Sequence, residues 1–149
     1  MVHALREARR VLKPDGILID LRPAIEHSRV GILRAGRFRE LGRTCERFDG
    51  GRAANRAVSH VLARRLFRRS LRVRLECDVF LASPGALREW LAEYTDLAGL
   101  PAHEKLVQRA KIASQGGQAA SRIVYRIPLV MRVLRRERPN RRHATPRSR

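Results

Sequence analysis

Four polar side chains follow the first strongly apolar stretch of the sequence closely enough to share one site. Asp20 and Arg22 come directly after the apolar residues 17–19, and Glu26 and His27 follow a few positions later. An arginine can pair with a carboxylate or a phosphate, and a histidine can accept or donate a proton near neutral pH. We therefore treat all four as candidate substrate-binding residues. The alternative interpretation is structural: Asp20 and Arg22 cap loops, and His27 is an ordinary surface residue.

The rest of the sequence contains no recognisable catalytic or metal-binding motif. The other histidines fit no HExxH or His/Cys ligand pattern, and Cys45 and Cys77 form no CxxC pair. The Gly-x-Ser-x-Gly motif of a hydrolase nucleophile is absent. Neither Gly50-Gly51 nor Gly116-Gly117 follows a parallel-strand pattern with dinucleotide-binding spacing. We therefore assign no catalytic residue, no cofactor-binding residue and no metal ligand.

A helix, a turn and a strand position the candidate residues. Apolar side chains recur at helical spacing up to Leu12, and Pro14 ends the helix because it lacks an N–H. Asp15-Gly16 predicts a tight turn in which Gly16 takes a positive φ. The uninterrupted apolar run at residues 17–19 is typical of a central strand covered on both faces. Ligands of open α/β sheets bind at the carboxyl ends of such strands.

Residues 10–19, RVLKPDGILI, resemble a segment of the class I S-adenosylmethionine-dependent methyltransferases, RVLKPGG in that family, which leads into the fifth strand of the sheet. Asp15 stands where the family usually has glycine. The family's segment lies far into the domain, behind a Gly-rich loop that holds the cofactor, whereas this one starts the chain. The resemblance implies the C-terminal half of a Rossmann-like domain, with the cofactor-binding half missing. It implies S-adenosylmethionine as cofactor, but not its binding by this chain alone.

The elements that follow suit this resemblance. Two short strands around Ala35-Gly36 predict an inserted β-hairpin, in the region where methyltransferases commonly face the acceptor substrate. Asp49 is placed to cap a helix that runs to about Phe67. Period-two alternation predicts strands over 71–81 and 119–134. By the resemblance these are the sixth strand and an antiparallel seventh, which lies between the fifth and the sixth. Pro128 should then occupy a bulge or an unpaired position.

Two helices are expected between these last two strands. Ser83-Pro84 predicts the start of the first helix, whose aromatic residues Trp90 and Tyr94 either pack in the core or line an acceptor pocket. A turn over 96–101, a helix over 102–114 and a loop over 115–118 follow. The predicted fold class is α/β, a mixed sheet with an antiparallel last strand and an inserted β-hairpin. Residues 1–134 form the half-domain, and 135–149 form a disordered Arg-rich tail.

The formal net charge of +19 is open to two interpretations. Of the 33 basic residues, 30 are arginine, which favours a bias from GC-rich codons, while a nucleic-acid-binding surface is the alternative. The few aromatic residues and the lack of an RNA-binding motif count against the alternative. The sequence has no signal-peptide pattern and no apolar run long enough for a membrane span. Two cysteines far apart in the sequence suit a reducing cytoplasm.

The sequence therefore predicts a methyltransferase-like protein that keeps the acceptor side and is inactive as an isolated chain. Two other classes remain open. One is a small basic module that binds nucleic acid, and the other is a non-catalytic interaction domain whose open sheet edge pairs with another chain.

Overall fold

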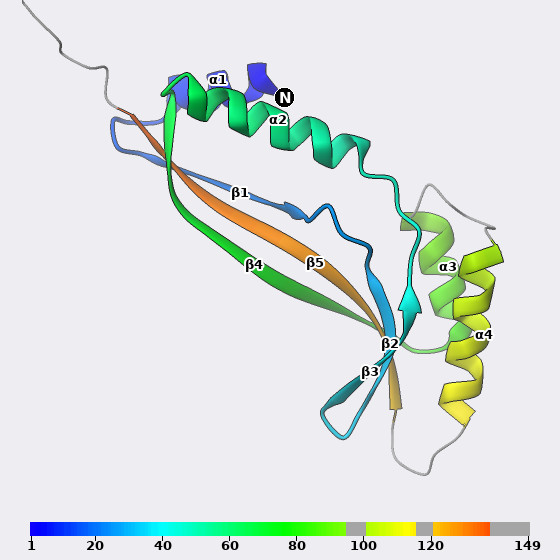
Figure 1. Ribbon diagram of the computed structural model, residues 1–149. Helices are drawn as coiled ribbons and strands as arrows, with labels where there is room; N and C mark the ends of the chain where they lie inside the picture. The colour runs from blue at the N-terminus through cyan, green and yellow to red at the C-terminus, as the bar shows by residue number, and fades with distance from the viewer. Residues whose placement is uncertain (95–100, 116–120, 138–149) are drawn as a thin grey trace, which may run out of the picture.

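The two longest strands, β4 (Phe67–Leu81) and β5 (Ser121–Arg136), form an antiparallel ladder along the length of the fold (Figure 1). The computed structural model describes residues 1–94, 101–115 and 121–137. The predicted turn over 96–101 and the predicted loop over 115–118 fall largely outside them. Of the predicted tail over 135–149, residues 138–149 lie outside them, whereas the prediction is wrong for Arg135 and Arg136, which pair with neighbouring strands in β5. The other elements are α1 (Val2–Val11), β1 (Ile17–Pro23), β2 (Arg29–Arg34), β3 (Arg37–Arg43), α2 (Asp49–Ala63), α3 (Pro84–Tyr94) and α4 (Pro101–Gln115).

β5 is the centre of an α/β fold with an open five-stranded sheet. One edge of β5 pairs with β4, and the other pairs with β1 at residues 129–135 and with β2 at residues 121–126. β3 adds to the outside of β2. The predicted place of the last strand, between the strand at 17–23 and the strand at 67–81, is confirmed. The prediction of a mixed sheet is wrong for the described residues, where every pairing is antiparallel, because β5 separates β1 from β4.

Pro128 lies where β5 changes partner from β2 to β1. The β1 ladder ends at Pro23 opposite Leu129, and the β2 ladder begins at Arg29 opposite Arg126. The Pro128 carbonyl faces this gap and accepts a hydrogen bond of 2.8 Å from the Ala24 N–H. The missing N–H of a proline therefore costs no ladder hydrogen bond here. Pro128 stands opposite Glu76 in the β4 ladder, so the predicted unpaired position is confirmed only for the edge of β5 that faces β1 and β2.

The turn before β1 differs from its prediction in one respect. Asp15, not Gly16, takes the positive φ, at 62°. Aspartate is one of the residues that adopt this region most readily. Gly16 is needed for a different reason, since a Cβ there would lie 2.8 Å from the Lys13 carbonyl oxygen.

The predicted hairpin of β2 and β3 is confirmed, and its turn residues Ala35 and Gly36 both have positive φ. Gly31 lets the hairpin close tightly, because a Cβ there would lie 2.5 Å from the Phe38 ring. The Arg126 guanidinium stacks 4.1 Å from the centre of that ring and also pairs with Asp78 at 2.6 Å. That hydrogen bond lowers the pKa of Asp78 below its usual value. Gly31 weakens the strand propensity of β2, but it leaves room for the Phe38 ring, whose contact with Arg126 holds the hairpin on β5.

Of the two predicted helix caps, Ser83 is confirmed and Asp49 is wrong. Ser83 caps α3 as expected, since its Oγ accepts a hydrogen bond of 3.1 Å from the Ala86 N–H. The cap predicted at Asp49 is wrong, because Asp49 lies in the first turn of α2 and Phe48 takes the N-cap position without a side-chain bond. α2 ends at Ala63, earlier than expected, since β4 already begins at Phe67. No helix in the described part of the chain is both long and apolar enough to cross a bilayer.

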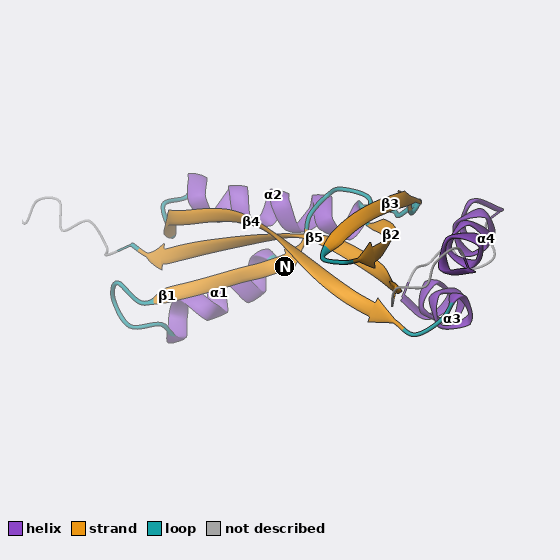
Figure 2. Ribbon diagram, turned by 90° about the horizontal axis from the view of Figure 1, so that it is seen from below, coloured by secondary structure: helices purple, strands orange, loops and turns teal. Residues whose placement is uncertain are grey.

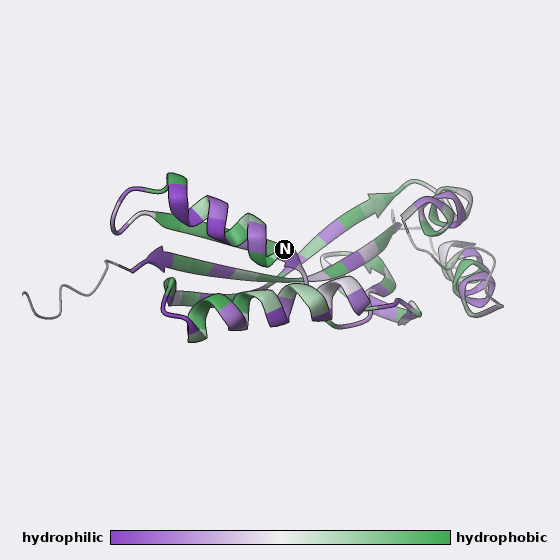
Figure 3. Ribbon diagram, turned by 90° about the horizontal axis from the view of Figure 1, so that it is seen from above, coloured by the Kyte–Doolittle hydropathy of each residue, from purple (hydrophilic) through white to green (hydrophobic). Residues whose placement is uncertain are grey.

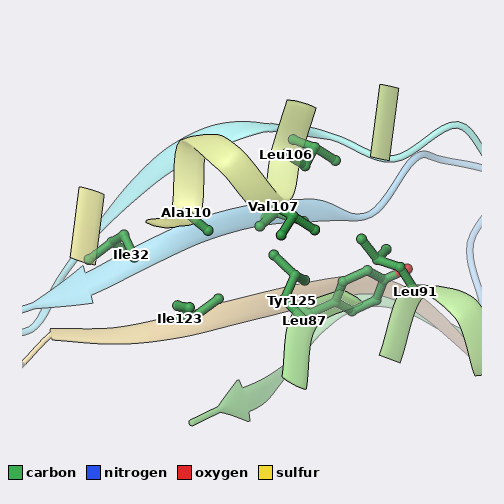
Figure 4. Close-up of a cluster of buried hydrophobic side chains, with 9 residues drawn as sticks. Ile32, Leu87, Leu91, Leu106, Val107, Ala110, Ile123 and Tyr125 are labelled. Carbon is green, nitrogen blue, oxygen red and sulfur yellow. The ribbon is translucent and has the colours of Figure 1, made fainter. Parts of the chain in front are cut away.

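Two pairs of helices cover the sheet at its two ends. Figure 3, seen from above, shows α1 and α2 in front of the strands. They pack on a cluster built from Val58, Val61, Phe67 and Leu134. At the other end, α3 and α4 pack on β2 and β5 through a second cluster, shown in Figure 4. Its central members are Ile32, Leu87, Leu91, Leu106, Val107, Ala110, Ile123 and Tyr125.

The alternation of β5 shows that the two helix pairs cover opposite faces of the sheet. Val130 and Leu134 are buried at the α1–α2 end, whereas Ile123 and Tyr125 are buried at the α3–α4 end. Successive side chains of a strand point to opposite faces, so the even-numbered and odd-numbered positions belong to different faces. Val124, between Ile123 and Tyr125, is buried as well, so both faces of β5 are covered at the α3–α4 end and one face at the α1–α2 end.

This arrangement leaves an apolar area of the sheet without a helix over it. Ile17, Ile19 and Leu21 of β1 are 49%, 57% and 54% exposed, so the prediction of a strand covered on both faces is wrong for the described residues. Figure 2, seen from below, shows the strands in front of α1 and α2 with no helix over them. We call this area the bare face. The register places nine apolar side chains on it: Ile17, Ile19, Leu21, Leu71, Val73, Leu75, Leu129, Met131 and Val133.

Leucine truncations on the two faces should separate the covered face from the bare one. Leu134→Ala removes a fully buried side chain and should lower the free energy of unfolding by about 2–5 kcal/mol. Leu71→Ala removes a side chain that is 46% exposed and should cost less than about 1 kcal/mol. Urea unfolding of both variants gives the comparison. Equal losses would show that the face holding Leu71 is covered in solution.

Candidate functional site

A cavity of about 610 Å³ opens beyond the carboxyl end of β1. The 24–28 loop, the segment from β3 into α2, one residue of α3 and the middle of β5 meet around it. Its walls are mainly apolar, with polar groups at a few points. The lining residues are Met1, Arg22, Pro23, Ala24, Ser28, Glu46, Arg47, Phe48, Gly50, Gly51, Ala54, Trp90, Tyr125, Ile127 and Pro128.

Two of the candidate residues, Asp20 and Arg22, form one network inside β1 rather than after its end. The Arg22 Nε donates to the Asp20 carboxylate at 3.0 Å. Its two terminal nitrogens donate to the Gly51 carbonyl oxygen at 3.2 Å and to Asn55 Oδ1 at 2.8 Å. Both groups are mostly buried, with side-chain exposures of 14% for Arg22 and 17% for Asp20. The network therefore fixes the first turns of α2 against β1.

Arg132 of β5 belongs to the same network as Asp20 and Asn55. It is 7% exposed, and it donates to Asp20 at 2.9 Å and to Asn55 at 2.7 Å. One carboxylate thus pairs with two guanidinium groups, which leaves this group of three charges at +1, and the asparagine oxygen accepts from both guanidinium groups. A buried charge without partners would be costly, so this arrangement keeps Arg132 in the interior. The loop-capping role considered for Asp20 and Arg22 does not describe this strand-to-helix network.

The other two candidate residues, Glu26 and His27, lie apart from that network. Glu26 forms an ion pair with Arg74 of β4. The His27 Nδ1 accepts a hydrogen bond of 3.2 Å from the Glu46 N–H, and its ring lies 5.0 Å from the Phe48 ring. The four residues therefore separate into the Asp20–Arg22 network, the Glu26 ion pair and a His27 contact with a cavity-lining loop.

Glu46 and Tyr125 form the polar part of the cavity wall. The Tyr125 hydroxyl donates to Glu46 Oε1 at 2.7 Å, and the Ser28 N–H donates to Oε2 at 3.1 Å. Thr44 holds the adjacent backbone, since its hydroxyl and its N–H both donate to the Ser28 carbonyl oxygen. The Glu46 carboxylate is therefore fixed in position beside an otherwise apolar wall.

Tyr125 stays protonated in this environment. It is 4% exposed, and burial raises the pKa of its phenol well above the usual value near 10. The adjacent Glu46 carboxylate acts in the same direction, since a second negative charge beside it is unfavourable. Tyr125 is therefore a hydrogen-bond donor to Glu46 and not a proton-accepting group at neutral pH.

Sequence reasoning missed Asn55, Arg132, Glu46 and Tyr125. Asn55 and Arg132 had no signal beyond a polar residue in a helix and in a strand. Tyr125 carried the period-two pattern of a core strand, which hid its hydroxyl contact. Trp90 was considered for a pocket, and it does line the cavity, where its ring lies 5.9 Å from that of Tyr125. The side chain of Tyr94 is outside the described residues.

The described residues show no arrangement that resembles a metal site or a nucleotide cradle. No group of three or more His, Cys, Asp or Glu side chains gathers there as ligands. Gly50 and Gly51 lie in the first turn of α2 and so do not form a turn after a parallel strand. Comparisons with protein-family models, with curated proteins and with solved structures found no match to this chain.

A pH titration should report the burial of Tyr125. In a Tyr94→Phe variant, Tyr125 is the sole tyrosine, and its absorbance should not change near pH 10 while the protein stays folded. Above pH 10 the unfolded chain releases a proton that the folded protein keeps. The free energy of unfolding should therefore fall with rising pH, by at most about 1.4 kcal/mol per pH unit.

The control for this titration adds Tyr125→Phe to the Tyr94→Phe variant, which leaves the protein without a phenol. Its free energy of unfolding should lose that contribution to the fall above pH 10. An ionisation step centred near pH 10 in folded Tyr94→Phe protein would contradict the buried position of the hydroxyl.

Proposed function

We propose that this chain forms the acceptor side of an S-adenosylmethionine-dependent methyltransferase-like domain. The cavity beyond β1 would be the acceptor pocket. The cofactor-binding strands would come from polypeptide outside these 149 residues, either in the same protein or in a separate chain. S-adenosylmethionine supplies the methyl group in such a reaction, and the residues described here would bind and orient the acceptor.

The arrangement of β1, β5 and β4 is the observation that carries the proposal. β1 and β4 run parallel to each other, and β5 lies between them and pairs antiparallel with both. A class I methyltransferase sheet ends in this way, with the seventh strand between the fifth and the sixth. The helix, proline and tight turn that resemble the family lead into the strand that takes the fifth position. The sequence resemblance at residues 10–19 and the order of the strands β1, β5 and β4 therefore agree.

The position of the cavity supports the same proposal. It lies at the carboxyl end of β1, where ligands of open α/β sheets bind. The β2–β3 hairpin and the loop after it follow β1 directly, in the region that commonly faces the acceptor in the family. Methyl transfer depends strongly on positioning, and a pocket walled by Phe48, Trp90 and Tyr125 suits that task.

β1 and the bare face offer a place for the cofactor-binding half. The outer edge of β1 has no strand partner among the described residues. Ile17, Ile19 and Leu21 lie along that edge on the bare face. A free edge beside an exposed apolar area is a site where proteins associate. Cofactor-binding strands from other polypeptide would extend the sheet from β1, and their helices would cover the bare face.

Calorimetry with S-adenosylmethionine tests this division of roles. The 149-residue chain alone should show no micromolar binding, because its described glycines form no cradle for the cofactor. The same chain extended by in-frame coding sequence upstream of Met1 should bind it, if that sequence encodes a strand, a Gly-rich turn and a helix. Micromolar binding by the short chain would contradict the division. An extended chain that carries this pattern and still does not bind would overturn the methyltransferase proposal.

The bare face also favours a second candidate function, a non-catalytic domain that associates with another polypeptide.

Both candidate functions require the bare face to be accessible in the isolated chain. The fluorescence of the dye 8-anilinonaphthalene-1-sulfonate in the presence of the isolated chain should therefore be strong. Ile19→Lys should reduce this dye fluorescence several-fold. Ile112→Lys is the matched control, since Ile112 is 69% exposed on α4 and the change adds the same charge. Equal dye binding by both variants would show that the dye site is elsewhere.

A further inference from the structure

The cavity combines aromatic walls with one fixed carboxylate. Phe48, Trp90 and Tyr125 come from three separate segments, and Ile127 adds an aliphatic side chain. At about 610 Å³ the cavity falls within the range of small-molecule sites. Flat aromatic side chains favour a ligand with a planar, apolar body, since such rings stack or meet edge to face. The aromatic lining therefore favours the planar, apolar part of a ligand, and the polar groups of the cavity select its head group.

Glu46 is the only acidic residue among those that line the cavity. Each of its carboxylate oxygens already accepts one hydrogen bond, from Tyr125 or from Ser28. A carboxylate has about four acceptor positions, so about two remain for a ligand. The bonds it already makes hold the group in a fixed orientation, which reduces the entropy lost on binding.

Glu46 also differs from most other carboxylates of this basic protein. Eight carboxylates in the described residues pair with arginines. Glu46 has no such partner within the same residues, although the protein carries 33 lysines and arginines. The cavity therefore presents a negative charge that its own side chains leave without a cation.

The arginines of the cavity do not reverse this preference. All three guanidinium nitrogens of Arg22 already donate, to Asp20, to Gly51 and to Asn55. Arg47 is exposed at the cavity rim, where water screens its charge. An anionic ligand head would thus meet a fixed carboxylate, and Arg22 would have only one further N–H on each terminal nitrogen to offer it.

We infer that the cavity binds a planar, largely apolar small molecule whose head group donates a hydrogen bond to Glu46. A protonated amine fits best, and a neutral hydroxyl or ring N–H fits less well, because a charge-assisted hydrogen bond is the stronger one. This inference rests on the proposed function, for which it names the class of acceptor. Its geometry, however, depends only on residues of this chain.

Three probes with one ring system separate the head groups: tryptamine, tryptophol and indole-3-propionate. Saturation-transfer NMR and calorimetry should rank tryptamine first, tryptophol second and indole-3-propionate last. We expect at least a tenfold difference between the first and the last. The measurement needs no S-adenosylmethionine, so its failure is separate from failure of the methyltransferase proposal.

Two variants connect the ranking to Glu46. Glu46→Gln should weaken tryptamine binding about tenfold and remove its preference over tryptophol. Glu40→Gln is the matched control, since Glu40 pairs with Arg43 on the hairpin and does not line the cavity. Tyr125→Phe keeps the carboxylate and the ring, so it should keep the ranking even if Glu46→Gln folds poorly.

Three outcomes would overturn the inference. The first is indole-3-propionate binding as tightly as tryptamine. The second is unchanged tryptamine binding in folded Glu46→Gln protein. The third is the absence of binding by all three probes at millimolar concentration, which would show that the cavity does not accept a ligand of this class.

Discussion

The backbone hydrogen bonds of β5 are the constraint on which the rest of the structure depends. β4 occupies one edge of β5 over almost its whole length, and β1 and β2 share the other edge. α1 and α2 pack where β1 pairs with β5, and α3 and α4 pack where β2 does. Every described element therefore takes its position from a strand near the end of the chain. Local contacts alone cannot assemble such a fold, since the closing partner is more than a hundred residues from β1.

The same strand fixes the polar groups of the site. Arg132 can be buried because Asp20 stands opposite it in the register and Asn55 of α2 accepts a hydrogen bond from it. Tyr125 lies on the part of β5 before Pro128, where β5 pairs with β2, and its hydroxyl donates a hydrogen bond to Glu46. The two networks are thus connected through one backbone, although no hydrogen bond joins them directly. The cavity lies between the two networks, since Arg22 of one network and Glu46 and Tyr125 of the other line it.

Patterns with a local physical cause were predictable from the sequence. Ser83-Pro84 and Ala35-Gly36 act within a few residues, and the alternation of β5 and the place of Pro128 follow from strand geometry. The covering of β1 was not predictable, because an apolar run of three residues looks the same whether one face or both are buried. The contacts of Asp20 with Arg132 and of Tyr125 with Glu46 were not predictable either, since the two residues of each pair lie 112 and 79 positions apart in the sequence.

Helices attached to opposite ends and opposite faces of one ladder carry the walls of the cavity. α2 contributes Gly51 and Ala54, and α3 contributes Trp90. The distance between these walls depends on how far β4 and β5 coil around each other between the two attachment points. Twist is larger and more variable in narrow ribbons than in wide sheets. Widening the sheet by adding strands beside β1 would flatten this coil, and the aperture of the pocket would change without any contact to its lining.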